Sequence, residues 1–191
     1  MRVGVLAAQG AFIEHIAALR RLDVDADPVR LPRELDGLDA LVIPGGESTS
    51  ISRVMLDYEL TDAVRKLAAA GLPIWGTCAG MILLAKDISD GEKVEPLRLM
   101  DITVRRNAFG RQVDSFEADL DVPALADGPF HAVFIRAPVI ESVGKGVDVL
   151  ARLPEGGIVA VQQGKLLGTA FHPELTEDLR FHRYFLGLAG R

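Results

Sequence analysis

The chain has a single cysteine, Cys78, which lies between two glycines in the stretch GTCAG, directly after an apolar run. The spacing G-x-Cys-x-G is the cysteine form of the nucleophile elbow, in which a sharp turn between a strand and a helix exposes the reactive side chain. Gly76 and Gly80 would remove side chains that clash with neighbouring elements. The N-terminus of the following helix would favour a thiolate, and the N–H of Ala79 would point toward an oxyanion. The alternative is a cysteine that only fills the core, because free cysteine is among the most buried residue types.

A second candidate group is the stretch FHPEL, which contains His172 and Glu174. His172 could take the thiol proton, and Glu174 could orient the imidazole and stabilise its charged form. Two residues apart on an extended segment, their side chains would point the same way. The order cysteine, histidine, glutamate differs from that of the α/β-hydrolases, in which the acid precedes the histidine. H-P-E alone is a weak signal, but with the elbow it indicates a nucleophilic cysteine site.

The third stretch is PGGES, residues 44–48. Two glycines after a strand let backbone N–H groups approach a substrate closely, so Gly46 could supply a second oxyanion donor. The alternative is a plain turn in which Ser48 caps the following helix. Both can hold together, because a helix N-terminus binds anions for the same reason that it needs a cap.

These three stretches follow predicted strands of an α/β chain. In the first half, short apolar runs at 2–8, 25–31, 38–46 and 72–76 alternate with helical patterns at 11–22, 48–71 and 79–88. This alternation predicts a parallel sheet covered by helices on both faces. The second half adds short strand-like runs and a closing helix, at 101–110, 113–120, 131–138, 147–153, 157–164, 165–171 and 175–190. We therefore expect a mixed, mostly parallel sheet whose carboxyl edge gathers the three stretches.

Composition limits the classes of function. The chain has 191 residues, of which 49% are hydrophobic and 25% charged, and this predicts one globular domain over 1–191. The net charge of −6 argues against a nucleic-acid partner. No apolar run reaches about 18 residues, so we expect no membrane span. One cysteine forms no internal disulfide, and the N-terminal run is typical of a strand rather than a signal peptide, so we expect a cytoplasmic protein. The sequence shows no cluster of metal ligands.

G-x-Cys-x-G with a distant H-P-E is similar to the class I, triad-type glutamine amidotransferases. Most members carry glutamine in a longer pattern, G-x-C-x-G-x-Q, whereas Met81 is followed here by Ile82. Longer stretches resemble one branch, the glutaminase-subunit family of two-component pyridoxal 5'-phosphate synthases. They cover nearly the whole chain: GVLAAQGAF, PGGEST, GTCAGMILLAK, RNAFGRQVDSFEADL, VFIRAP and FHPELTED.

The resemblance implies a fold, a reaction and a partner. The fold would be the three-layer, flavodoxin-like α/β fold of class I glutamine amidotransferases. Cys78 would be the nucleophile, His172 the base and Glu174 the third member of a triad that hydrolyses L-glutamine, with no metal and no bound cofactor. A synthase subunit would take the ammonia in a hetero-oligomeric complex. The oxyanion donors would be the N–H groups of Gly46 and Ala79, and glutamine would be held by Gly46, Glu47, Ser48, Arg106, Ile135 and Arg136.

Several assignments rest on the resemblance alone. Without it, Arg106 and Arg136 would be interpreted as surface ion pairs, and only the alignment of the motif favours Arg106 over Arg105. An arginine at the substrate α-carboxylate is chemically sensible, because a guanidinium can donate two parallel hydrogen bonds to it. Gln9 is expected near the oxyanion loop or the partner contact. The remaining histidines match no catalytic motif and are expected on the surface or in packing: His15, His131 and His182.

Two competing hypotheses stay open at this stage. A DJ-1/PfpI-like protein would share a similar sheet and a cysteine elbow but act as a protease, deglycase or chaperone. A pseudoenzyme or regulatory subunit would only bind a partner. The H-P-E stretch favours the amidotransferase, and the intact set of Cys78, His172 and Glu174 argues against a pseudoenzyme.

Overall fold

The structure, a computed structural model, describes residues 1–90, 93–106 and 115–190. The strands are β1 Arg2–Leu6, β2 Asp25–Val29, β3 Ala40–Ile43, β4 Ile74–Thr77, β5 Ala85–Ile88, β6 Met100–Arg105, β7 Ser115–Leu120, β8 Phe130–Ile135, β9 Val139–Val143, β10 Asp148–Arg152, β11 Ile158–Gln163 and β12 Leu166–Thr169. The helices are α1 Phe12–Arg20, α2 Ser48–Asp57, α3 Leu60–Ala69, α4 Ala79–Leu84 and α5 Arg180–Leu188, with 3₁₀ turns η1 Pro32–Leu35 and η2 Pro173–Leu175.

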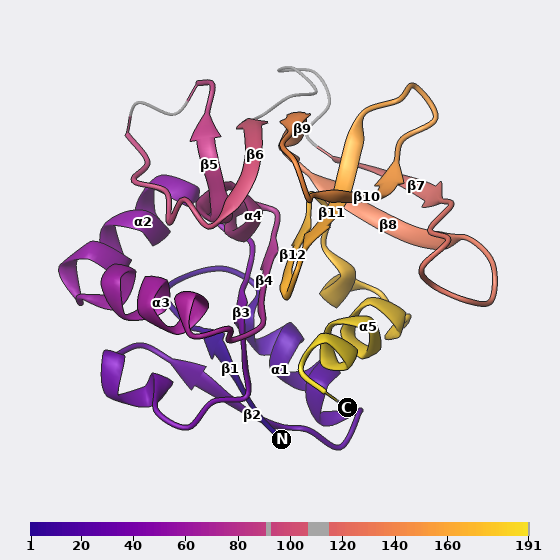
Figure 1. Cartoon of the computed structure of the whole chain (residues 1–191). Coiled ribbons are helices and arrows are strands. Elements are labelled where there is room, and N and C mark those ends of the chain that lie inside the picture. The colour runs from indigo at the N-terminus through magenta and orange to yellow at the C-terminus, as the bar shows by residue number, and fades with distance from the viewer. Residues whose placement is uncertain (91–92, 107–114, 191) are drawn as a thin grey trace.

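The central sheet is mixed. Its strand order is β2-β1-β3-β4-β12-β11-β9-β6-β5, with β10 added beside β11. The half from β2 to β12 is parallel, whereas β11 runs antiparallel to β12, β9 and β10. Figure 1 shows α2 and α3 on one side of this sheet and α1 and α5 on the other. The expected α/β architecture, a mostly parallel mixed sheet flanked by helices, is confirmed.

The parallel strands are buried on both faces because they consist of apolar runs. Every residue of β3 and of β4 is buried, as expected for strands covered by helices on both sides. Trp75 of β4 packs against Phe181 and Phe185 of α5, which fixes the last helix on the sheet. The separate hairpin of β7 and β8 joins this aromatic core through Phe130, whose ring meets that of Phe181 edge to face.

Two expected helices are wrong in extent. The pattern over 48–71 predicts one helix, but α2 ends at Asp57 and α3 begins at Leu60. Glu59 has a left-handed backbone (φ 59°) at the break, although no glycine or proline there marks it. The pattern over 79–88 is helical only to Leu84, because the chain then pairs with β6 as strand β5.

Other boundaries also differ from the sequence pattern. The closing helix begins at Arg180 rather than at residue 175, since η2 and a polar loop come first. The strand β9 was not expected at all. Residues 107–110 of the expected strand 101–110, and 113–114 of the strand 113–120, lie outside the described residues.

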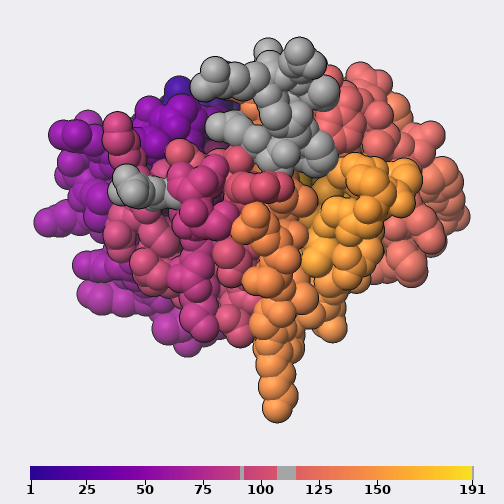
Figure 2. All heavy atoms as spheres, turned by 90° about the horizontal axis from the view of Figure 1, so that it is seen from above, coloured from indigo at the N-terminus to yellow at the C-terminus, as the bar shows by residue number. Residues whose placement is uncertain are grey.

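Viewed from above in Figure 2, the turn between β9 and β10 projects from one side of the body. Within the described ranges, no helix is long and apolar enough to cross a membrane.

The topology brings the three candidate stretches together. The parallel strands β3, β4 and β12 are neighbours, with Ile43 in register with Gly76 and Thr77 with Thr169. Their carboxyl ends therefore share one edge of the sheet, and PGGES, GTCAG and FHPEL each begin there. β1 lies next to β3 and ends just before Gln9.

Candidate active site

Cys78 occupies a strained turn between β4 and α4. Its backbone has φ 49° and ψ −106°, a conformation that costs a side-chain-bearing residue about 1–3 kcal/mol. Flanking hydrogen bonds hold it there, because Cys78 N donates to Thr169 O at 2.7 Å and Ile82 N donates to Cys78 O at 3.2 Å. The sharp, strained turn that the G-x-Cys-x-G spacing predicts is thus present at Cys78.

The two flanking glycines are required by close backbone contacts. A Cβ on Gly76 would lie 2.5 Å from the carbonyl group of Gly80. A Cβ on Gly80 would lie 1.8 Å from the carbonyl oxygen of Ile43. Both distances are far below van der Waals contact, and backbone atoms cannot move aside as a flexible side chain can. The expectation that larger residues would clash is confirmed, and α4 rests directly on β3 and β4.

His172 and Glu174 follow β12 and meet through a short hydrogen bond. His172 Nδ1 lies 2.7 Å from Glu174 Oε1, and both residues are buried. The backbone N–H of His172 donates to Val133 O of β8 at 2.8 Å. The sequence pattern suggested an extended segment here, and this prediction is wrong. Pro173–Leu175 instead form a 3₁₀ turn, which brings the two side chains together. With Nδ1 engaged, Nε2 is the nitrogen left for Cys78.

Burial and charge set the protonation of this pair. Burial disfavours the imidazolium of His172, but interactions with Cys78 and Glu174 outweigh it and raise the pKa of His172 to about 10. Burial likewise opposes the carboxylate of Glu174, but His15 and His172 outweigh it and hold the pKa of Glu174 well below its usual range. At neutral pH the site therefore contains a His172 imidazolium beside a Glu174 carboxylate.

The glycines of PGGES pack against the same groups. A Cβ on Gly45 would lie 2.4 Å from His172 Cε1 and 3.3 Å from Cys78 Cβ. On the other side, a Cβ on Gly10 would lie 1.8 Å from the carbonyl oxygen of Gly45. Glu47 N donates to Gln9 Oε1 at 3.4 Å. Gln9 therefore lies beside the oxyanion loop, as expected, whereas the close packing of Gly45 was not anticipated from its motif.

Glu47, not Ser48, caps helix α2. Its carboxylate accepts from Thr49 N at 3.0 Å and from Ser50 N at 2.7 Å. Burial raises the pKa of Glu47, but the hydrogen bonds from Thr49 and Ser50 outweigh burial and lower it. The interpretation of Ser48 as the cap is thus wrong, because the longer glutamate side chain reaches both N–H groups.

A cavity of about 330 Å³ opens at this edge of the sheet. Its volume is at the lower end of the range for small-ligand sites. All but one of the predicted site residues line it; Glu174 lies behind His172. The predicted residues in the lining are Gly46, Glu47, Ser48, Cys78, Ala79, Arg106, Ile135, Arg136 and His172. Thr49 and Ile82 also line it and were missed, although both lie within stretches that the resemblance had singled out.

The two neighbouring arginines point to different places. Arg106 lines the cavity and donates from Nη1 to Ser48 Oγ at 3.3 Å and Thr49 Oγ1 at 3.4 Å. Arg105 is half exposed and its Nε lies 3.3 Å from Glu141 Oε1. Of the two arginines, only Arg106 is in the lining of this cavity. Arg136 also lines the cavity, with a left-handed backbone at φ 42°.

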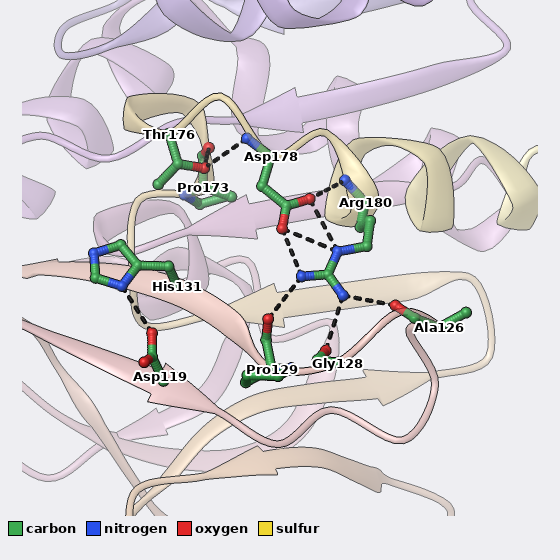
Figure 3. Close-up of polar contacts among 9 residues, drawn as sticks. All are labelled: Asp119, Ala126, Gly128, Pro129, His131, Pro173, Thr176, Asp178 and Arg180. Atoms are coloured by element: carbon green, nitrogen blue, oxygen red, sulfur yellow. Dashed lines mark hydrogen bonds and ion pairs between the residues drawn. The ribbon is translucent and has the colours of Figure 1, made fainter.

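The loop that follows Glu174 is anchored by Arg180, the first residue of α5. Figure 3 shows its guanidinium between the Asp178 carboxylate and a group of backbone carbonyls. Nη1 donates to Ala126 O at 2.6 Å and Gly128 O at 2.9 Å, and Nη2 donates to Pro129 O at 2.8 Å. These carbonyls immediately precede β8, the strand that leads to Ile135. The Arg180 side chain thus ties the loop after Glu174 to β8, the strand that carries Ile135 to the cavity.

The three remaining histidines have different surroundings. His131 is exposed and lies between Asp119 and Glu117, as a surface residue would. His15 and His182 are fully buried in packing, but His15 Nε2 lies 3.2 Å from Glu174 Oε2. The sequence missed this contact, and the EHI pattern around His15 gives no signal for it. No group of three metal-ligating side chains occurs in the part of the chain that the structure describes.

The comparison with protein families assigns the chain. A model of the SNO glutamine amidotransferase family matches residues 5–189. The chain belongs to this family. The protein named pyridoxal 5'-phosphate synthase subunit PdxT from Herpetosiphon aurantiacus is 61% identical over 190 residues, which cover 98% of this chain and 100% of that protein.

Solved structures agree with the SNO family assignment. A crystal structure of a glutamine amidotransferase has a TM-score of 0.93 and 54% identity, and the match covers 99% of both chains. The structure of PurLQS from Thermotoga maritima has a TM-score of 0.72 at 16% identity, and the match covers 97% of both chains. The second likeness shows the fold alone. Together they confirm the expected class I glutamine amidotransferase fold.

Proposed function

We propose that this SNO family member hydrolyses L-glutamine to glutamate and ammonia through a thioester on Cys78. The observation that carries the proposal is the placement of a strained, cavity-facing cysteine beside the hydrogen-bonded pair of His172 and Glu174. The family assignment supports the same reaction.

In the first step, the Cys78 thiolate attacks the side-chain amide carbon of glutamine. The carbonyl electron pair moves to oxygen, and the N–H groups of Gly46 and Ala79 stabilise the oxyanion. When the tetrahedral intermediate collapses, the carbon–nitrogen bond breaks and His172 gives its proton to the departing ammonia. The products of this step are ammonia and a γ-glutamyl thioester.

In the second step, the now neutral His172 takes a proton from water as the water attacks the thioester carbon. Collapse of this second intermediate breaks the carbon–sulfur bond and releases glutamate. The Cys78 thiolate and the His172 imidazolium are then restored. Every bond change is assigned to groups of this chain, so the proposal includes neither a metal nor a cofactor.

We assign the recognition of glutamine to the cavity lining. Arg106 and Arg136 bring two guanidinium groups to the cavity, and either can pair with the substrate α-carboxylate. Arg106 Nε is buried and lies 3.8 Å from Asp90 Oδ1, so this carboxylate holds the guanidinium from behind at ion-pair distance. The remaining contacts in this proposal come from Gly46, Glu47, Ser48 and Ile135.

The proposal includes a partner. Related proteins are named subunits of pyridoxal 5'-phosphate synthase. We therefore propose that a synthase subunit binds this chain in a hetero-oligomeric complex and receives the ammonia. The chain would act as one glutaminase domain over 1–191, weakly active alone, in the reducing environment of the cytoplasm that its single cysteine suits.

The test is to measure glutamate and ammonia formed from glutamine by the purified chain, with and without the matching synthase subunit. We expect weak activity alone and a rise of about tenfold or more with the partner. Full activity without the partner would contradict the two-component function but keep the glutaminase chemistry. No activity under either condition would overturn the proposal.

A further inference from the structure

The second oxygen of the Glu174 carboxylate has a partner that the H-P-E stretch does not contain. Glu174 is fully buried at its side chain, and Oε1 is engaged by His172. Oε2 lies 3.2 Å from Nε2 of His15 on helix α1 and has no well-aligned hydrogen-bond donor among the described residues. Because a buried carboxylate oxygen without a donor is costly, the His15 contact compensates for the desolvation of Glu174.

The His15 ring is fixed by three elements. Besides Glu174, Nε2 lies 3.2 Å from Thr77 Oγ1, on the strand that leads to Cys78. Nδ1 lies 3.1 Å from His182 Nε2 on α5. The ring also meets Trp75 edge to face, with 5.4 Å between the centroids. His15 therefore has little freedom to rotate away from Glu174.

These contacts specify where the protons are. A carboxylate only accepts hydrogen bonds, so the proton of His15 belongs on Nε2. Nδ1 then accepts from Nε2–H of His182. This leaves His182 Nδ1 as a lone pair, and among the described residues that buried atom has no partner. An unpaired lone pair is tolerated better than an orphaned N–H donor.

The protonation of His182 agrees with this arrangement. Burial and the neighbouring His15 lower the pKa of His182 to about 3, so its ring is neutral. Arg21, directly after α1, also lowers the pKa of His182, whereas Glu174 raises it. Arg21 is itself paired with Glu177, whose Oε2 lies 2.8 Å from Nη1. The charged and titratable groups facing the cluster are thus Glu174, His172, Arg21 and Glu177.

We propose that His15 is a positioning residue of the triad. Its Nε2–H, which Glu174 Oε2 shares with Thr77 Oγ1, holds the carboxylate by electrostatic attraction at 3.2 Å so that Oε1 faces His172, and His182 fixes the tautomer of His15 from behind. The line of contacts runs from Cys78 through His172, Glu174 and His15 to His182. The inference deepens the proposed glutaminase function and rests on it for its catalytic meaning.

Because Cys78 is the only cysteine of the chain, its alkylation by iodoacetamide reports the triad alone. The rate is measured against pH for wild type, His15→Phe and His15→Gln. Phenylalanine keeps an aromatic ring beside Trp75 but removes both nitrogens, whereas the glutamine amide can place an N–H near the position of Nε2. His131→Gln, which removes an exposed histidine, is the matched control.

Loss of His15 should shift the rise of the alkylation rate with pH to higher pH, and the midpoint of that rise is the quantity compared. Without His15, burial raises the pKa of Glu174 with only His172 opposing it, and a protonated Glu174 no longer stabilises the imidazolium. We expect the midpoint in His15→Phe to rise by about one pH unit, and kcat with the partner to fall about tenfold at unchanged KM. His15→Gln should stay within about 0.3 pH units of wild type.

The outcomes separate this inference from the proposed function. The positioning role would be overturned if the pH midpoint of Cys78 alkylation were unchanged in a folded His15→Phe protein. It would also be overturned if His15→Phe and His15→Gln lost kcat equally at every pH. If wild type forms no ammonia with its partner while the His15→Phe midpoint still shifts, the proposed function fails and the positioning role stands.

A second measurement covers the case in which His15→Phe does not fold. Nitrogen-15 NMR of the histidine side chains in wild type reports the tautomer directly. We expect His15 to be protonated on Nε2 with Nδ1 accepting. A proton on Nδ1 of a neutral His15 would overturn the inference, because Nε2 would then offer Glu174 no donor.

Discussion

The two halves of the candidate site are held in place by different means. Cys78 is fixed by its own backbone, with a strained φ of 49° between glycines that touch Ile43 and each other. His172 and Glu174 are fixed by side chains from elsewhere in the chain, namely His15 on α1 and the Arg180 anchor at the start of α5. The nucleophile depends on local geometry, and its acid–base partners depend on long-range contacts.

This difference explains how each half tolerates change. A Cβ on Gly76 or Gly80 would lie far below van der Waals distance from backbone atoms, so neither position has room for a side chain and the elbow should fail abruptly. A set of side-chain hydrogen bonds can lose one member and reorganise, so the other half should weaken gradually.

The largest effect should come from Cys78→Ala, which removes the sulfur but none of the contacts that shape the turn. We expect glutamine hydrolysis with the synthase partner to fall by about 10³-fold or more. The Tm should stay within about 2 °C of wild type, because the glycine contacts remain. Unchanged hydrolysis would end the assignment of Cys78 as nucleophile.

Gly80→Ala should break the elbow itself. The new Cβ would meet the Ile43 carbonyl oxygen at 1.8 Å, and we expect a loss of about 3 kcal/mol or more in the free energy of unfolding. Gly187→Ala in α5 is the control, since its Cβ would meet nothing within 4 Å. That helical substitution should be neutral or stabilise by about 0.5–1 kcal/mol. Equal urea midpoints for the two variants would contradict the account.

A milder effect is expected from Arg180→Lys, which keeps the charge but removes the planar fork. Lysine cannot reach the Asp178 carboxylate and the three carbonyls together. Because these carbonyls are exposed and water can replace the donor, the free energy of unfolding should fall by about 1 kcal/mol. Hydrogen exchange should accelerate in 126–130 while 76–80 stays protected. Arg152→Lys, at an exposed carbonyl contact, should change neither segment.

The smallest effect should follow His131→Gln, on the hairpin of β7 and β8. Hydrogen bonds to Asp119 and Glu117 raise the pKa of His131 above its ordinary value of 6.5. The stabilisation is therefore fully present below that value and is lost as pH rises through the folded-state pKa. The variant should have a slightly lower Tm than wild type at about pH 5.5 and the same Tm at about pH 9. A difference that grows with pH would have the wrong sign.

The same contrast between local geometry and long-range contacts separates the parts of the site that the sequence predicts from those that it does not. The elbow, the roles of Gly76 and Gly80, and the meeting of three strand ends could be predicted, because glycine spacing and strand polarity are local features of the sequence. The residues of the cavity came from the longer motifs. The Glu47 cap, the break at Glu59 and the turn at Pro173–Leu175 were missed, because residue-level patterns there permit more than one conformation.

The contacts behind Glu174 could not be predicted. His15 lies in an ordinary amphipathic pattern, and nothing in the sequence around it indicates that α1 packs beside η2. The Arg180 anchor is likewise defined only once the 126–129 carbonyls and α5 are brought together by the fold. Long-range pairing of single side chains has no period or spacing that one sequence can display.

The most direct test of the central claim is the mass of the protein during turnover. The chain, mixed with its synthase partner and glutamine, is quenched in acid and digested, and the mass of the peptide that contains Cys78 is measured. We predict a γ-glutamyl adduct on Cys78 that forms with glutamine, disappears when glutamine is exhausted and is absent from Cys78→Ala. Ammonia production at full rate with no adduct on that peptide at any time after mixing, or an adduct on another residue, would contradict the account.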